Sequence, residues 1–139
     1  MQGRKGGGPR LAAGGERGQA MAEFALGAML FFMVFLGALH FALAVHSRHV
    51  AETAAVEGAR WAAAEPADIA RGQERARQVL RDGLGRWGGG YAVQGVDQGE
   101  TVLMRVRGSY IFALPVLGGR QVHFQTEATV RKEGFRPGP

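Results

Sequence analysis

The feature that most constrains this chain is an apolar stretch over residues 24–45. His40 is the only polar side chain in this stretch. As a helix that rises about 1.5 Å per residue, about 20 such residues cross a hydrocarbon core of about 30 Å. The stretch is apolar on every face, so it has no amphipathic stripe with which to dock on a soluble core. We therefore predict a membrane span, with a fully buried core helix as the alternative.

Residues 1–18 form a basic segment ahead of this stretch. It carries Arg4, Lys5, Arg10 and Arg17 against Glu16, a local charge of 4 − 1 = +3. The remaining 13 basic and 11 acidic residues add +2 to the total of +5. Basic residues at one end of a span mark its cytoplasmic side. The sequence therefore predicts a cytoplasmic N-terminus and an extracytoplasmic C-terminal part, which accounts for the basic balance without a nucleic-acid partner.

A secretory signal peptide is the rival interpretation of this N-terminal region. Residues 42–44, Ala-Leu-Ala, form a small-residue motif of the kind that signal peptidase cuts. The apolar run is longer than the roughly 7–15 residues of a signal-peptide core, which favours a retained anchor. A mature chain that starts at Val45 would overturn the anchor.

The junction in front of the span carries the sharpest local pattern. Gly18 is followed five positions on by Glu23, and Phe24 then begins the apolar helix. A carboxylate that enters hydrocarbon loses its hydration. Glu23 is either a helix-start acid in the headgroup layer, favoured by the helix dipole, or the partner of a cation in the membrane. A cut after Gly18 would supply that cation as the new amine of Gln19.

Beyond the span, the helix is expected to continue over residues 46–64 and to end at Glu65 and Pro66, because the residue before a proline avoids the α conformation. Small residues recur along one face at helical spacing. They are Ala51, Ala54, Ala55, Gly58, Ala59 and Ala62. This stripe either admits a second helix at close range or belongs to an alanine-rich helix that covers the protein's own sheet. The sequence leaves both alternatives open.

Residues 67–84 predict a second helix. Its expected inward face consists of Ile69, Ala76, Val79, Leu80 and Leu84. The arginines between residues 71 and 81 are interleaved with acids and lack aromatic partners, so we predict a solvated face and no nucleic-acid site. The glycines of residues 83–90 predict a loop around Trp87.

The last third of the chain has the period-two pattern of β-strands. Residues 91–96 predict a short strand, and residues 102–112 and 121–131 predict two long antiparallel strands. Pro115 and Gly118–Gly119 are the expected turn between them. The predicted class is α+β, with a long N-terminal transmembrane helix that extends into a small extracytoplasmic domain, where a second helix packs on a short antiparallel sheet. The predicted division is a basic leader (1–18), the transmembrane helix (19–46), the outer domain (47–133) and a frayed tail (134–139).

Taken together, these segments resemble a TadE-like minor pseudopilin of the Tad/Flp (tight adherence) type IV pilus family. Gly18, Glu23 and Phe24 match the family's G-x-x-x-x-E-[FY] processing junction. Residues 54–60, AAVEGAR, resemble its A-x-E-G-A-R stretch, and residues 128–133 resemble its closing strand. The chain departs from most type IV pilins in that the mature protein would begin with Gln19, where they have phenylalanine or methionine.

The resemblance implies a part in the assembly of an adhesive Tad/Flp pilus, after cleavage following Gly18 by a prepilin peptidase. The implied partners are other pilins or pseudopilins, the Tad secretion platform and membrane lipid. The implied location is the cytoplasmic membrane, crossed once, or the pilus itself. The alternative is an unprocessed bitopic membrane protein whose outer domain binds an envelope partner.

The sequence offers little catalytic chemistry. It has no cysteine, no glycine-rich phosphate loop and no G-x-S-x-G nucleophile, so we expect no enzyme and no cofactor. His40, His46 and His49 are the one cluster to test as metal ligands, but HEXXH spacing is absent, and we predict interfacial histidines and no metal. A membrane-tethered metal or nucleic-acid binder is thus the third hypothesis.

Overall fold

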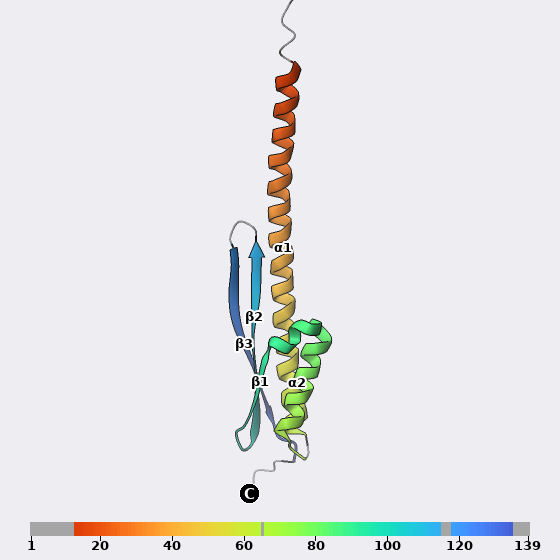
Figure 1. Ribbon diagram of the computed structural model, residues 1–139. Coiled ribbons are helices and arrows are strands. Elements are labelled where there is room, and N and C mark those ends of the chain that lie inside the picture. The colour runs from red at the N-terminus through yellow and green to blue at the C-terminus, as the bar shows by residue number, and fades with distance from the viewer. Residues whose placement is uncertain (1–12, 65, 115–117, 135–139) are drawn as a thin grey trace, which may run out of the picture. The chain divides into compact units, whose positions relative to one another are not determined.

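The computed structural model describes residues 13–64, 66–114 and 118–134, and the chain divides into two units, Met1–Ala38 and Leu39–Pro139. Figure 1 shows the elements in chain order. They are helix α1 (Ala13–Ala63), helix α2 (Ile69–Leu84), the 3₁₀ helix η1 (Gly85–Gly90) and strands β1 (Ala92–Asp97), β2 (Thr101–Leu114) and β3 (Gly118–Arg131). The predicted α+β class, with a long apolar first helix, a second helix and an antiparallel sheet, is confirmed.

The unit that ends at Ala38 is described from Ala13 onward and is entirely helical. Its large apolar side chains are exposed; Phe24 is 78% and Phe31 63% accessible. The most apolar 18-residue window of the helix has a mean hydropathy of 2.3, and none of it is buried inside the protein. A core helix would be covered by protein, so the apolar stretch has the surface of a candidate membrane span.

The predicted basic leader, residues 1–18, is helical at its end. α1 begins at Ala13, so residues 13–18 are helical although Gly15 and Gly18 are poor helix formers. Once a helix is nucleated, each added residue gains a hydrogen bond, and Glu16 in the first turn complements the helix dipole. Residues 1–12, with three of the four leader cations, lie outside the described part.

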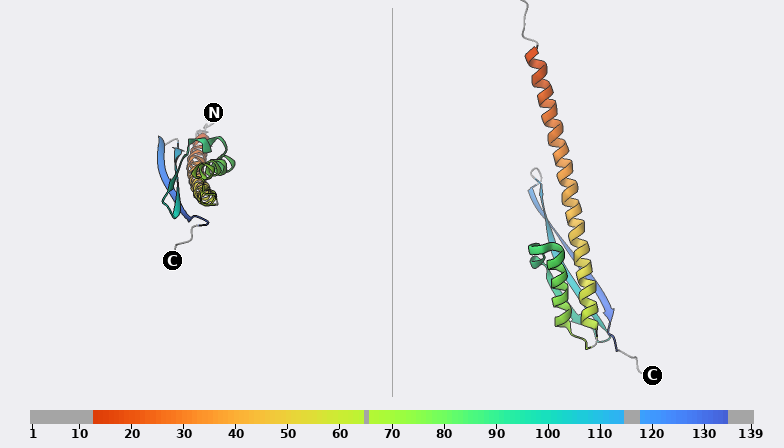
Figure 2. Two further views of the ribbon diagram at one scale, coloured as in Figure 1. Left: turned by 90° about the horizontal axis from the view of Figure 1, so that it is seen from below. Right: turned by 90° about the vertical axis from the view of Figure 1, so that its right-hand side faces the viewer.

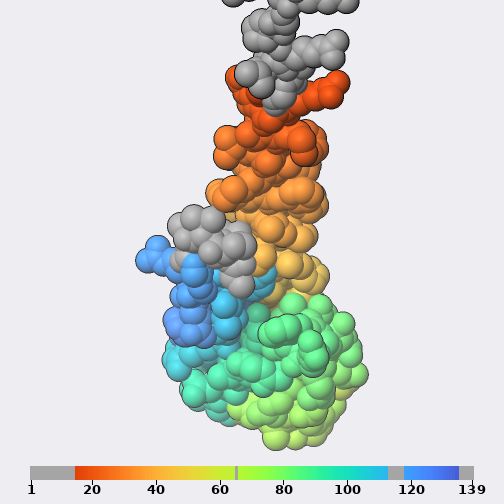
Figure 3. Space-filling model, turned by 45° about the horizontal axis from the view of Figure 1, so that its top comes forward, coloured from red at the N-terminus to blue at the C-terminus, as the bar shows by residue number. Residues whose placement is uncertain are grey.

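The unit from Leu39 onward has two layers, with both helices on one face of a three-stranded sheet (Figure 2, left). The strand order is β1-β2-β3, and both pairs are antiparallel. Alternate residues of β2 point to the helices, and Val102, Met104 and Val106 are completely buried. In the space-filling view, the green atoms of α2 and η1 form one packed surface over this unit (Figure 3). The predicted period-two strands are confirmed.

Local sequence explains how the helices begin and end. α1 ends at Ala63, just before Pro66, as predicted; Glu65 lies outside the described residues. The second helix begins at Ile69, two residues later than predicted, because Asp68 caps it. The Asp68 carboxylate accepts hydrogen bonds from the backbone N–H groups of Ala70 (2.8 Å) and Arg71 (3.4 Å).

The glycine-rich segment after α2 is the 3₁₀ helix η1 and not the predicted loop. Gly85 adopts a positive φ of 57°, which turns the chain at the end of α2. Gly88 is buried so closely against α2 that an added Cβ would lie 2.3 Å from the Leu80 carbonyl oxygen. Trp87 remains 71% exposed. The predicted turn at Pro115 lies outside the described residues, and Gly118 and Gly119 belong to β3.

Hydrogen bonds hold the two residues after β3 against the rest of the unit. The N–H of Glu133 donates to the carbonyl of Ala63 (3.0 Å), and the Lys132 N–H donates to that of Glu100 (2.9 Å). The Lys132 ammonium donates to the Asp97 carboxylate at 2.7 Å, and this bond holds the pKa of Asp97 below its ordinary value. In the predicted tail, residues 135–139 lie outside the described part.

Candidate functional site

The junction residues lie together on the exposed first turns of α1. Gly18, Glu23 and Phe24 are all exposed, and a Cβ added to Gly18 would meet no atom within 4 Å. The Gln19 side-chain amide donates to the Glu23 carboxylate at 2.9 Å, one helical turn away. The structure therefore brings the expected new N-terminal residue and the junction acid onto one face of the helix.

The backbone at Gly18 is helical, and this affects how a peptidase could reach it. A protease that holds its substrate extended must first unwind residues 13–18. Glycine in a helix is less stable than alanine by about 1 kcal/mol, so Gly15 and Gly18 make this end of α1 the easiest to open. Both glycines have free space around them, so their identity is not required by packing.

The small-residue stripe lies inside the unit from Leu39 onward. Its alanines are 0–1% exposed, and Gly58 is also buried. Ala51, Ala54 and Ala55 pack with Leu80 of α2 and Val106 of β2. The last members pack with Val102 and Met104 of β2; they are Ala59 and Ala62. The stripe thus lies between α2 and the sheet of the same chain.

Two glycines mark the closest approach of α1 and α2. A Cβ on Gly58 would lie 2.9 Å from the Gly72 carbonyl oxygen and 2.9 Å from the Ala76 Cβ. A Cβ on Gly72 would lie 2.4 Å from the Gly58 carbonyl oxygen and 2.4 Å from the Ala62 Cβ. The backbones touch at this crossing, so neither position has room for a side chain.

The E-G-A-R residues each have a structural task at this crossing. Glu57 faces the guanidinium of Arg75 on α2 at 3.5 Å and that of Arg60 at 4.0 Å. Gly58 contacts α2 through its backbone, and Ala59 packs on the sheet. The motif therefore joins α1 to both of its neighbours, and its contacts are those of a folding element.

The arginine face of α2 differs from its prediction in one respect. Arg71 and Arg75 do have an aromatic partner, because each guanidinium carbon lies 5.6 Å from the ring centre of Trp61 on α1. Arg81 donates to Glu74 at 2.7 Å, which holds the pKa of Glu74 below its ordinary value. These arginines are thus engaged with side chains of the same chain.

The three histidines of α1 contact different groups. The His40 ring packs on two aromatic rings of β2, His46 Nε2 lies 3.3 Å from the Gly83 carbonyl oxygen, and His49 Nδ1 lies 3.5 Å from Glu52. Among the described residues, no three His, Cys, Asp or Glu side chains are grouped so that they could hold a metal ion.

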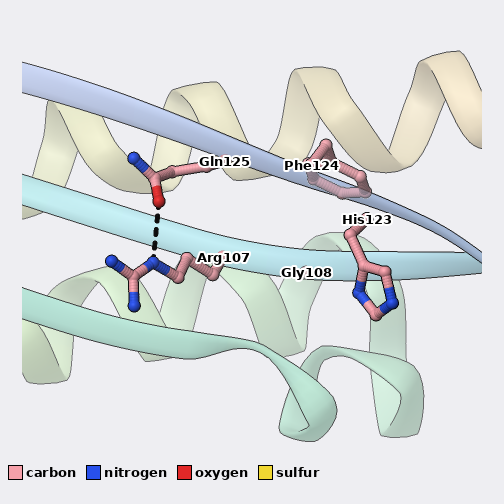
Figure 4. A pocket seen from close by; sticks show the side chains of 5 residues that line it. All are labelled: Arg107, Gly108, His123, Phe124 and Gln125. Carbon is pink, nitrogen blue, oxygen red and sulfur yellow. Dashed lines mark hydrogen bonds between the residues drawn. The ribbon is translucent and has the colours of Figure 1, made fainter.

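A shallow pocket of about 280 Å³ lies over the paired strands β2 and β3. Figure 4 shows its lining residues, with the Arg107 guanidinium bonded to the Gln125 amide oxygen at 2.7 Å. The remaining lining residues are Gly108, His123 and Phe124. The pocket is open, and the arginine is already engaged, so it offers no catalytic arrangement.

Comparison with known families identifies the first part of the chain. Residues 18–60 match the model of the TadE-like protein family. The resemblance to TadE-like proteins is confirmed over this segment. The match begins at Gly18 of the junction and ends at Arg60 of the E-G-A-R motif, so it contains both motifs and the apolar helix between them. No curated protein and no solved structure gave a match to the chain.

The TadE-like match indicates a Tad pilus-associated protein, and the exposed apolar helix indicates a membrane protein. TadE-like pilus proteins are structural and not enzymes. Sequence reasoning did not single out Gly72, the partner of Gly58 at the helix crossing. A glycine in the middle of an otherwise well-formed helix was the available signal, because that position is costly unless packing requires it.

Proposed function

We propose that this TadE-like protein is a minor pseudopilin that acts in the assembly of a Tad/Flp pilus and that a prepilin peptidase cleaves it after Gly18. The observation that carries the proposal is the family match that starts at Gly18, at the head of an exposed apolar helix, with Glu23 five residues on. In this proposal the chain crosses the cytoplasmic membrane once, and the unit from Leu39 onward is extracytoplasmic.

Cleavage would change the electrostatics of the junction. The new α-amine of Gln19 would carry a positive charge at the start of the helix, about one turn from the Glu23 carboxylate. Glu23 can then pair with its own amine or with that of a neighbouring pilin-type subunit. A charge left unpaired in the membrane costs on the order of several kcal/mol, so the acid would favour the register in which each amine meets a carboxylate.

Phe24 and the side chains after it set the depth of the helix. They are large, apolar and exposed on all sides of α1, which suits lipid or the apolar helices of other pilins. The proposed partners are therefore other pilins or pseudopilins and the Tad secretion platform. The small residues of the E-G-A-R segment are already covered by α2 and the sheet, so we assign the contacts with other subunits to the apolar part of α1.

Co-expression with a prepilin peptidase tests the processing step. The wild-type chain should lose its first 18 residues, as measured by intact mass, and Gly18→Val should stay full length because the branched side chain obstructs the extended pose at the cut. Gly27→Val is the matched control, since Gly27 is also an open helical glycine and lies beyond the junction. A wild-type chain that the peptidase leaves intact would refute processing and support the unprocessed bitopic protein.

Glu23→Gln tests the role of the junction acid. This variant keeps the shape and can still accept from Gln19, but it removes the charge. It should insert and be cleaved normally, while co-purification with Tad pilin subunits falls. Glu16→Gln is the control, because Glu16 is exposed in the segment that cleavage removes. Unchanged recovery of the pilin subunits with Glu23→Gln would contradict the assembly role.

A further inference from the structure

The β2–β3 hairpin extends beyond the three-stranded part of the sheet. β1 pairs with β2 only as far as Ala92 opposite Arg107. The pairing of β2 with β3 continues to Leu114 opposite Gly118. Residues 108–114 of β2 are therefore paired with β3 alone, and we call residues 108–114 and 118–123 the hairpin end. Figure 1 shows it as a two-stranded projection of the sheet.

This hairpin end packs against a residue from the predicted span. The ring of His40 lies 6.3 Å from that of Tyr110 and 6.4 Å from that of Phe112, measured between centroids. The two β2 rings contact each other edge to face at 5.0 Å. His40 falls within residues 24–45, which the sequence pattern assigned to the membrane, yet a β-hairpin lies beside it.

Residue 40 cannot lie in the hydrocarbon core of a membrane while the hairpin end lies beside it. Beyond Arg107, the β2 edge that faces away from β3 has no strand partner among the described residues, so its backbone groups need water or headgroups to bond. Open sheet edges that face lipid do not occur inside the hydrocarbon region. The hydrocarbon must therefore end before His40. About 20 helical residues that end at Leu39 begin near Ala20, which still places Glu23 in the first turn of the span.

The hairpin end exposes two large apolar side chains. Ile111 is 57% exposed and Val122 50%, and they lie on opposite faces of the hairpin. On α1, Phe41, the residue after His40, is 66% exposed. Exposed apolar side chains, with a tyrosine and a histidine on the same elements, are typical of residues in a membrane interface.

The charge of the hairpin end also suits a membrane surface. The hairpin end, residues 108–114 and 118–123, includes one arginine, Arg120, and no aspartate or glutamate. Arg120 lies on the hairpin end, opposite Phe112. At the other end of the sheet, Asp97 and Glu100 are paired with Lys132 and Arg131, so these four charges balance. A cationic, apolar end is complementary to anionic lipid headgroups.

We propose that the hairpin end rests in the headgroup layer of the membrane, on anionic lipid, and that the hydrocarbon span therefore ends near Leu39. The hairpin acts as a stop that fixes how deeply α1 enters the bilayer. The proposal shifts the predicted 19–46 span towards its N-terminus. It rests on the membrane span of the proposed function and is independent of cleavage and pilus assembly.

Site-specific labelling tests the location of the hairpin end. The chain has no cysteine, so one introduced cysteine carries a single environment-sensitive fluorophore. The full chain with Ile111→Cys is reconstituted in vesicles that contain phosphatidylglycerol. The label should shift its emission to the blue, be quenched by lipids with a spin label near the headgroup and lose its quenching by aqueous iodide. Val96→Cys is the matched control, because Val96 is also exposed, at 43%, on the same face at the other end of the sheet, and it should stay accessible to iodide.

A third label separates the hairpin from the span. Phe31→Cys should be quenched by lipids that carry the spin label deep in the acyl chain. If position 31 is quenched in this way and position 111 remains as accessible to iodide as position 96, the hairpin proposal is overturned while the span stands. If position 31 is also accessible to iodide, both the hairpin proposal and the membrane anchor fail.

The electrostatic part has its own variant. In the chain labelled at position 111, Arg120→Glu should reduce lipid quenching in vesicles with phosphatidylglycerol and have a smaller effect in vesicles of phosphatidylcholine alone. Arg71→Glu makes the same charge change at an exposed position at the start of α2 and should leave the quenching unchanged. An Arg120→Glu chain with unaltered quenching in both vesicle types would refute the role of anionic lipid.

Discussion

The two halves of helix α1 differ in the side chains they carry and in how far these are buried. Up to Ala38, the side chains are large and exposed, with Phe31 and Phe35 at 63% and 53%. Between Ala51 and Ala63, the alanines are 0–1% exposed. The difference lies in what each half faces, since lipid accepts bulk on all sides of a helix, whereas contact with α2 and the sheet requires small residues. Hydrophobicity alone would have ranked the first half as the core.

Truncation of a buried residue should show the largest difference in stability between changes in the two halves. Leu80→Ala removes the large α2 side chain, 1% exposed, that packs on the alanines of α1. It should lower the free energy of unfolding by about 2–5 kcal/mol, through lost burial and the cavity left behind. Denaturant unfolding of the full chain in detergent, followed by tryptophan fluorescence, measures it. Phe31→Ala is the control and should leave this transition unchanged. An equal loss of unfolding free energy in both variants would contradict the difference between the two halves.

An added methyl group gives the converse experiment. Gly72→Ala places a Cβ against the Gly58 carbonyl and should cost about 1–3 kcal/mol, because the two helices must move apart. Gly27→Ala adds the same methyl group in the exposed half, where nothing lies within 4 Å, and should not destabilise the unit from Leu39 onward. Melting curves of both variants in the same detergent measure the two changes in stability. A Gly72→Ala chain as stable as wild type would mean that the helices do not touch there.

The start of α1 should respond to helix propensity and not to packing. Gly15→Ala meets no neighbouring atom and should stabilise the local helix by up to about 1 kcal/mol. If the peptidase must unwind this end, cleavage after Gly18 should slow by up to about five-fold, a factor that corresponds to that energy. A time course of cleavage in membranes measures the rate, with Gly27→Ala as the control. Cleavage at an unaltered or faster rate would show that unwinding does not limit the reaction.

The smallest expected effect concerns pH. The hydrogen bond from Lys132 holds the pKa of Asp97 below its ordinary value of 3.8. Its stabilisation is therefore present above 3.8 and is lost as the pH falls through the lower folded-state value. Wild type should lose slightly more stability between about pH 5 and pH 2 than Lys132→Met, which lacks this bond. Parallel acid titrations of unfolding check this, with Arg71→Met as the control. Identical slopes for wild type and Lys132→Met would contradict the linkage.

The predictable parts of this structure are those set by local pattern. The apolar run, the break at Pro66 and the alternation around Met104 each indicated the right element. The contact between Gly58 and Gly72 could not be predicted, because it depends on how two helices cross. The stacking of Arg71 on Trp61 was missed for the same reason.

At the junction, too, the sequence predicted one property and not another. Residue types and spacing sufficed to predict the TadE-like resemblance, which the family match over residues 18–60 confirms. They did not predict that the backbone at Gly18 is helical, because the glycines there favour irregular structure on their own. The continuous helix behind them supplies the hydrogen bonds that outweigh this preference.

The most direct test of the pseudopilin function is the identity of the first residue in protein extracted from native membranes. N-terminal sequencing and intact mass together measure it without any variant. Processing after Gly18 predicts that the protein begins with Gln19. A chain that still begins with Met1, or one that begins with Val45 after signal-peptide cleavage, would contradict it.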